Sequence, residues 1–204
     1  MKKRVYYSLV LLILSFSILL TQSIVFAATE DTATLTANVQ QYISLSISSG
    51  ATVDFGNLTP GSPITAPNTG TIASVTTSSA SGYTVGLSDA SDTNSAMLHT
   101  DTTTYIADYA GTIATPTSWT GTGVGISLYA ADSEKEAKWG TGTTYNDSNN
   151  KYAGIPSATT IAHTVTTYHA GADTSSWAFK IDVSNSQKTG SYSGDVTFTA
   201  TAGL

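Results

Sequence analysis

Apolar residues recur at every second position over most of this 204-residue chain, and Ser or Thr fills most of the places between them. This is the period of a β-strand, whose successive side chains point to opposite faces of a sheet. No window of comparable length has helical spacing, and the most helix-compatible stretch, residues 130–137, allows about two turns. The alternating runs are residues 33–39, 43–47, 53–55, 83–87, 126–128, 161–165, 177–183 and 192–200.

Turn-forming residues separate these runs. Gly, Pro and Asn occur at Gly56-Asn57, Pro60-Gly61, 68–70, 146–150 and Thr189-Gly190. Eight or more short strands joined by polar turns predict an all-β fold, an antiparallel β-sandwich of the Ig-like or jelly-roll-like kind. Residues 88–125 are less regular and predict a loop insertion, with one or two further strands around residues 105–107.

The first residues indicate export. Lys2, Lys3 and Arg4 precede a mostly apolar run over residues 5–26, followed by the small residues Ala27 and Ala28. This is the pattern of a signal peptide, predicted here as residues 1–27 with cleavage between the two alanines. An uncleaved membrane anchor is the alternative, since about 20 apolar residues can span a bilayer. Both interpretations place the rest of the chain outside the cytoplasm, secreted or at the cell surface, with membrane contact only through this signal helix.

The alternation keeps one parity from residue 33 to residue 47, interrupted only at residues 40–42. A single run of that length is far longer than a usual strand of about five or six residues. It is either one long bent edge strand or an N-terminal arm followed by the first strand of the domain. The predicted organisation is therefore an arm or edge strand over residues 28–41 and one β-sandwich domain over residues 42–204.

Charge and cysteine content exclude several classes of protein. All 14 acidic residues follow residue 27, whereas three of the eight basic ones precede it, so the exported part is more acidic than the net charge of −6 for the whole chain. An acidic surface argues against nucleic acid and anionic membranes as partners. There is no Cys, so strand pairing and packing, without disulfides, must stabilise the fold.

No catalytic or cofactor-binding pattern is present. His99, His163 and His169 are scattered, and no nucleophile elbow or zinc-protease motif occurs. Two loops rich in Asp and Asn, residues 89–94 and 145–150, lack the spacing of an EF-hand, and turn formation explains them. The sequence therefore predicts a protein that is not an enzyme and has no cofactor or metal.

Five short motifs, in this order, carry a resemblance to a known family. They are "VDFGNLTPGSP" (53–63), "GTIASVTTSSASGYTVGL" (70–87), "SLYAADSEKEAKWGTGT" (127–143), "KYAGIPS" (151–157) and "GSYSGDVTFTATA" (190–202). The order resembles the spore coat U family, the secreted β-sandwich domains that include subunits of archaic chaperone-usher pili. The resemblance covers residues 32–202 and implies the same sandwich, with "KYAGIPS" as an architectural turn.

The chain departs from that family in two respects: it has no Cys, and residues 161–185 add material before the last strand. Domains of that family usually carry a disulfide, which this chain cannot form. The resemblance therefore does not imply that the family's dedicated chaperone and usher assemble this chain. The segment "GSYSG" and the Thr-rich run after it are also similar to the end of WxL cell-wall-binding domains. However, none of the three Trp residues is followed by x-Leu.

Two functions follow as expectations. The first is a bacterial surface subunit, pilin-like or coat-like, that self-associates or joins other surface subunits by strand donation. In that case Ala33, Leu35, Ala37 and Val39 would enter a neighbour's sheet. The second is a monomeric module that binds cell-wall polymer or glycan through exposed aromatic residues. The candidates for that contact are Tyr109, Trp119, Tyr129 and Trp139.

Overall fold

The computed structural model describes residues 30–89, 95–133 and 135–204. It divides into two units, residues up to Asn38 and residues Val39–Leu204, which are described separately. The predicted signal peptide and its cleavage site, Ala27 and Ala28, lie outside the described residues. Within the described ranges, no helix is long and apolar enough to cross a membrane.

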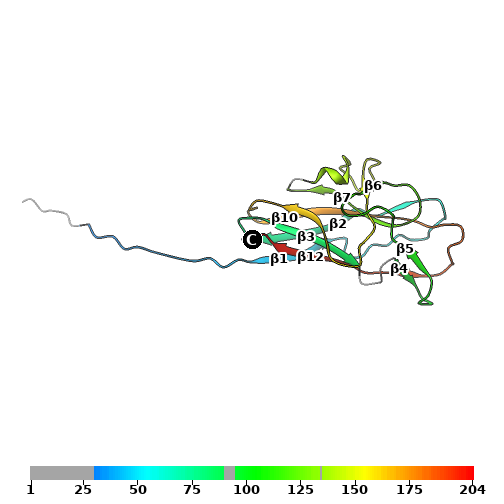
Figure 1. Ribbon diagram of the computed structural model, residues 1–204, viewed down its shortest axis with the longest axis horizontal. Helices are drawn as coiled ribbons and strands as arrows, with labels where there is room; N and C mark the ends of the chain where they lie inside the picture. The colour runs from blue at the N-terminus through cyan, green and yellow to red at the C-terminus, as the bar shows by residue number, and fades with distance from the viewer. Residues whose placement is uncertain (1–29, 90–94, 134) are drawn as a thin grey trace, which may run out of the picture. The chain divides into compact units, whose positions relative to one another are not determined.

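The regular elements of the second unit are almost all antiparallel strands, which confirms the all-β prediction (Figure 1). One short 3₁₀-helix, η1, is the exception among the described residues. The elements are β1 (Ile43–Ser49), β2 (Ile64–Thr77), β3 (Tyr83–Asp89), β4 (Ser95–His99), β5 (Tyr105–Ala107), β6 (Thr117–Ser118), β7 (Gly123–Ala131), η1 (Ala137–Trp139), β8 (Lys151–Tyr152), β9 (Thr160–Val165), β10 (Ala172–Asp182), β11 (Tyr192–Ser193) and β12 (Val196–Ala202).

Two main sheets enclose the core. One has the order β1-β2-β10-β7 and the other β12-β3-β9, and two smaller sheets, β11-β4-β5 and β6-β8, complete the unit. Inward-facing residues of both main sheets belong to one apolar cluster, with Val75, Leu87 and Trp177 almost inaccessible to solvent. The alternation of the sequence therefore corresponds to one buried and one exposed face of each sheet.

The longest strand, β2, was not among the predicted runs. Residues 68–70 were interpreted as a turn between elements, but they lie inside β2 as an irregularity in its pairing with β10, where the register shifts between Trp177 and Phe179. Gly70 has a φ of 72° there, a conformation that favours glycine. Turn residues in this sequence therefore mark a break in a ladder as well as the end of a strand.

Three further predictions differ from the structure. Val53 and Phe55 alternate like strand residues but belong to no strand. Ile161, expected to face the core, is 55% exposed because the register between β3 and β9 shifts beside it. The helix-compatible stretch 130–137 begins in β7, and only the single turn η1 forms at its end. Pairing with β10 thus overrides local helix preference in the first residues of that stretch.

The free edge of β9 is covered by side chains from η1 and the residue before it. The Thr164 N–H donates to Glu136 Oε1 at 2.7 Å, and Trp139 Nε1 donates to the Ala162 carbonyl at 3.1 Å. Glu136 Oε2 also lies 2.9 Å from Nδ1 of the fully buried His163. Burial favours the neutral form of Glu136, but hydrogen bonds from His163 and the Thr164 N–H outweigh burial and hold the pKa of this carboxyl below its usual range.

Replacing this carboxylate gives a pH-dependent loss of stability. We expect Glu136→Gln to lower the free energy of unfolding by about 1.5–3 kcal/mol at neutral pH, the value of hydrogen bonds to a charged group. A lowered pKa stabilises the fold only while the group is ionised, so the difference from the parent chain should shrink as the pH falls below about 4. Urea unfolding at pH 7 and pH 3 measures it; a difference that is independent of pH would contradict the assignment.

Candidate functional site

The predicted strand donor comprises the end of the first unit and Val39, the first residue of the second. Residues 30–42 form neither helix nor strand, and Leu35 is 94% exposed and Val39 83% exposed. The alternating segment, residues 32–39, is called the arm below. It holds all four predicted donor residues, Ala33, Leu35, Ala37 and Val39, and occupies no place in the sheets of the described chain. In the described structure β1 begins at Ile43, so residues 33–42 are not part of that strand.

On one side of the sandwich, two sheet edges lie next to each other without pairing. β1 is the edge of one main sheet and β12 the edge of the other, and among the described residues each pairs on one side only, with β2 and β3 respectively. The two strands are neighbours. Gln41 Nε2, before β1, donates to the carbonyl of Gly203, after β12, at 2.7 Å, so the strands run in opposite directions. We call the space between them the β1/β12 groove.

The inward-facing residues along this groove are apolar but incompletely covered. Ile43, Leu45 and Ile47 of β1 are half-buried, as are Val196, Phe198 and Ala200 of β12. The central strands differ, because Val85 and Leu87 of β3 are fully buried. Apolar surface that packs on the core yet stays accessible can gain further stabilisation from another apolar chain.

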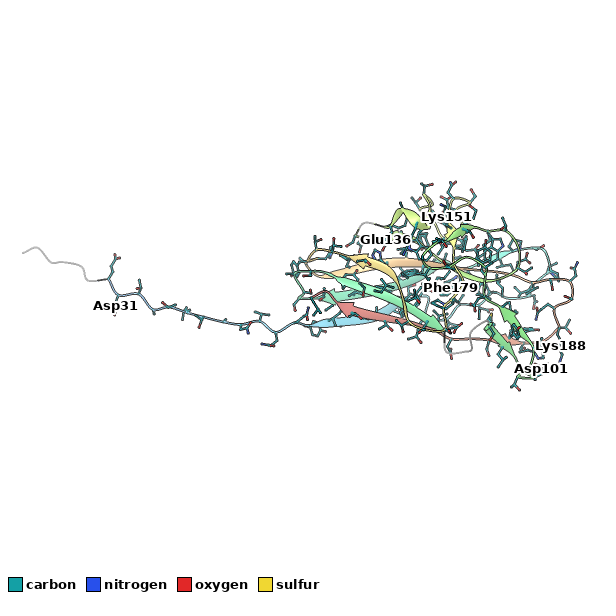
Figure 2. All side chains as sticks on the ribbon, in the orientation of Figure 1. Asp31, Asp101, Glu136, Lys151, Phe179 and Lys188 are labelled. Carbon is teal, nitrogen blue, oxygen red and sulfur yellow. The ribbon has the colours of Figure 1, made fainter. Side chains whose placement is uncertain are left out.

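Two hollows extend the groove beyond the end of β1. The first, about 340 Å³, is lined by Ile47, Val53, Phe55, Phe179 and Phe198, among others. The second, about 470 Å³, shares Val53, Phe55 and Met97 with the first and reaches the core residues Ile106 and Ile181. Phe179, which forms part of the floor of the first hollow, is labelled within the sandwich in Figure 2. The groove therefore opens onto the hydrophobic core.

The opposite side of the sandwich is closed. The edge of β7 pairs with residues outside the main sheets, since Ile126 and Ala153 exchange backbone hydrogen bonds of 2.8 and 2.9 Å and the Tyr109 N–H donates to the Val124 carbonyl at 2.8 Å. The edge of β9 is covered by Glu136 and η1, as described above. Proteins usually protect sheet edges from other chains. Here the described residues protect one pair of edges and leave β1 and β12 uncovered.

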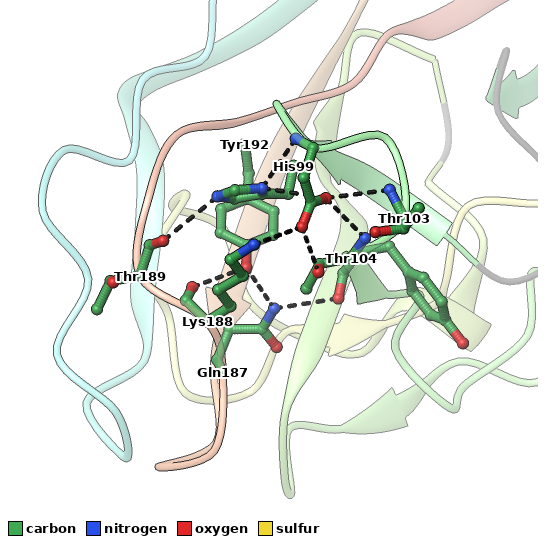
Figure 3. A network of polar contacts seen from close by, with 9 residues as sticks. His99, Thr103, Thr104, Gln187, Lys188, Thr189 and Tyr192 are labelled. Atoms are coloured by element: carbon green, nitrogen blue, oxygen red, sulfur yellow. Dashed lines mark hydrogen bonds and ion pairs between the residues drawn. The ribbon is translucent and has the colours of Figure 1, made fainter.

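A polar network fixes the far wall of the larger hollow, formed by residues 187–192 (Figure 3). Lys188 Nζ donates to Asp101 Oδ2 at 2.7 Å. This hydrogen bond, together with those that the carboxylate accepts from the backbone N–H groups of Thr104 and Thr103, holds the pKa of Asp101 well below its usual range. His99 Nδ1 lies 3.0 Å from the Asp101 backbone N and 3.1 Å from Asp101 Oδ1, and His99 Nε2 lies 3.3 Å from the Thr189 carbonyl oxygen. Asp101 and Lys188 are labelled side by side in Figure 2. The wall is thus tied to the β4–β5 hairpin.

The four aromatic residues predicted to contact glycan do not form one exposed surface. Trp139 is fully buried in the core, edge-on to Trp177 at 5.7 Å, and Tyr109 is only 4% exposed. For these two residues the prediction of exposure is wrong, because each packs inside the unit. Tyr109 also stacks on Trp119 at 4.4 Å and so covers one face of the half-buried indole. Tyr129, also half-buried, donates its hydroxyl to the Thr69 carbonyl at 3.1 Å.

Acidic side chains serve turns in this fold. Asp147, in one of the loops rich in Asp and Asn, accepts hydrogen bonds from the Thr143 and Asn149 N–H groups at 3.3 and 2.9 Å. Across the described ranges, no group of three or more His, Asp and Glu side chains is arranged to hold a metal ion.

Comparison with known proteins adds no relative: no model of a protein family matches the chain, and no curated protein matches it. The β1/β12 groove and the arm therefore carry the functional argument alone. Sequence patterns indicated the arm and the apolar parity of both edge strands. They did not indicate that β1 and β12 meet without pairing, or that Val53, Phe55 and Met97 line hollows beyond the end of β1.

Proposed function

We propose that the chain is a bacterial cell-surface structural subunit, pilin-like or coat-like, that assembles by inserting the arm of one copy into the β1/β12 groove of the next. The observation that carries this proposal is the uncovered pair of edges, with half-exposed apolar residues along both strands. The same chain supplies an unpaired segment with strand alternation. The predicted signal peptide agrees with a position at the cell surface.

The arm matches the two edge strands in length and in apolar character. Residues 33–39, β1 and β12 each comprise seven residues, or about 23 Å of extended chain. Leu35 and Val39 are the two large apolar residues of the arm, and burying each contributes about 1.5–3 kcal/mol. Ala37 lies between them and Ala33 precedes them on the same face; both small residues allow close approach, while the main chain pairs with the free edges.

A second copy is a better recipient than the arm's own domain. To enter its own groove, the arm must fold back beside β1 through a tight turn near residues 39–42. Those four residues include no Gly, Asn or Asp, which two-residue hairpin turns favour. Residues 40–42 are also held beside Ser78, because the Tyr42 N–H donates to Ser78 Oγ at 2.8 Å and the Ser78 N–H donates to the Tyr42 carbonyl at 3.0 Å.

Deleting residues 28–39 tests the proposal. We expect the full exported chain to form filaments in negative-stain microscopy and the deleted chain to remain monomeric and folded. A peptide of residues 30–41 added to the deleted chain should raise its melting temperature, because a ligand that binds only the folded state stabilises it. Filaments of the deleted chain, or a full chain that stays monomeric, would contradict strand donation. Binding of a monomeric chain to purified cell wall would then favour the wall-binding alternative.

A further inference from the structure

Residues 51–55, which follow β1, resemble a strand that lacks a partner. Thr52 and Asp54 are exposed and Val53 and Phe55 half-buried, which is the alternation of a sheet edge. Nevertheless they belong to no sheet. Among the described residues, the backbone of this segment makes no hydrogen bond, and the nearest polar contact is from the Gly56 N–H to Asp54 Oδ1 at 2.8 Å. A segment that packs on the core with its backbone unpaired can accept another strand.

The hollows of the groove lie beside this segment. Both are lined by Val53 and Phe55, and neither reaches Ile43 or Leu45 in the first half of β1. Across the first hollow lie residues 194–196 and Phe198, at the start of β12. At the other end of the groove, the hydrogen bond from Gln41 Nε2 to the Gly203 carbonyl ties the two sides together at 2.7 Å. The space for an added strand is thus between residues 51–55 and the start of β12.

We infer that residues 51–55 are the pairing edge for the donated arm and become a β-strand when the chain assembles, with a large arm side chain filling the hollow between Phe55 and Phe198. This inference rests on the proposed function and adds the acceptor segment to it. The partner is the arm of a second copy, because the arm is exposed and carries two large apolar residues, Leu35 and Val39, that can enter hollows lined by apolar residues such as Val53 and Phe55. The unassembled chain leaves this segment outside every sheet.

Hydrogen exchange measured on the full exported chain, unassembled and assembled, tests the inference. We expect the amides of residues 51–55 to exchange at least roughly tenfold more slowly after assembly, because exposed backbone groups become part of a ladder. The loop of residues 166–171, which lines neither hollow, should exchange at the same rate in both states. If β1 and β12 gain protection and residues 51–55 do not, this inference is wrong and strand donation stands. If the full chain never assembles, both fall.

A variant pair gives a second readout. Phe55→Ala enlarges both hollows and should raise the concentration needed for half-maximal assembly by at least roughly tenfold, as expected for losing a central apolar contact of an interface. Tyr168→Ala is the matched control, because Tyr168 is 57% exposed and lines neither hollow. Equal assembly by both variants would overturn the role of Phe55, and the exchange measurement decides the case if Phe55→Ala fails to fold.

Discussion

Leu35→Asp is expected to abolish assembly while leaving the domain as stable as that of the parent chain. Leu35 is 94% exposed in the unassembled chain, so the substitution removes no contact from the fold. In the β1/β12 groove of a second copy, the same position faces apolar residues such as Phe198. A carboxylate buried there without a partner costs several kcal/mol, so the affinity of the arm should fall by a factor of about 10³ or more.

The control for this prediction is the neighbouring residue. Thr34 has the opposite parity and faces away from the groove when the arm is a strand. Thr34→Asp adds the same charge one residue away and should assemble at close to the parental concentration. Sedimentation velocity and negative-stain microscopy measure assembly, and thermal unfolding checks the domain. Equal loss in both variants would show that net charge, and not burial of one face, limits assembly.

Much of the fold follows from the sequence because several of the main strands carry their own alternation. The alternation in residues 43–47, 83–87 and 177–181 is set by side chains that face either core or water, and this property is local. The same argument missed β2, whose ladder with β10 is interrupted at residues 67–70, between Ala66 and Thr71, and is formed on both sides of that break. It also predicted that Ile161 faces the core. That prediction is wrong because a register shift beside Gly86 reverses the parity of β9 at this point. Pairing between distant segments decides such positions, and no short window contains that information.

The site could be predicted only in part, for a related reason. The arm was recognised because Leu35 and Val39 alternate with small residues in a segment too long to be one strand with β1. Its proposed acceptor depends on β1 and β12, which are about 150 residues apart, meeting without pairing. The prediction of a glycan site from aromatic residues was wrong about the exposure of Tyr109 and Trp139, since a Trp in a loop packs under that loop as readily as it faces solvent. Trp139 does the former, and its indole N–H caps the edge of β9.

Trp177→Ala should produce the largest loss of stability among single substitutions in the core. Trp177 is fully buried at the centre of β10, lies edge-on to Trp139 and to Phe198 at 5.7 Å each, and donates its indole N–H to Ser175 Oγ at 2.9 Å. Removing a buried Trp costs about 3–5 kcal/mol, a large share of the 5–15 kcal/mol by which typical domains are stable. Equilibrium unfolding in urea measures the loss.

Trp119→Ala is the comparison that makes this prediction specific. Trp119 is half-buried and stacks on Tyr109 outside the main core cluster, so its loss should cost less than half as much as that of Trp177. The two variants should also differ in assembly, because Trp177 supports Phe198, which lines the β1/β12 groove, whereas Trp119 lines neither hollow. If Trp119→Ala proves as destabilising as Trp177→Ala, the packing around Tyr109 is a second core that stabilises the sandwich as much as the first.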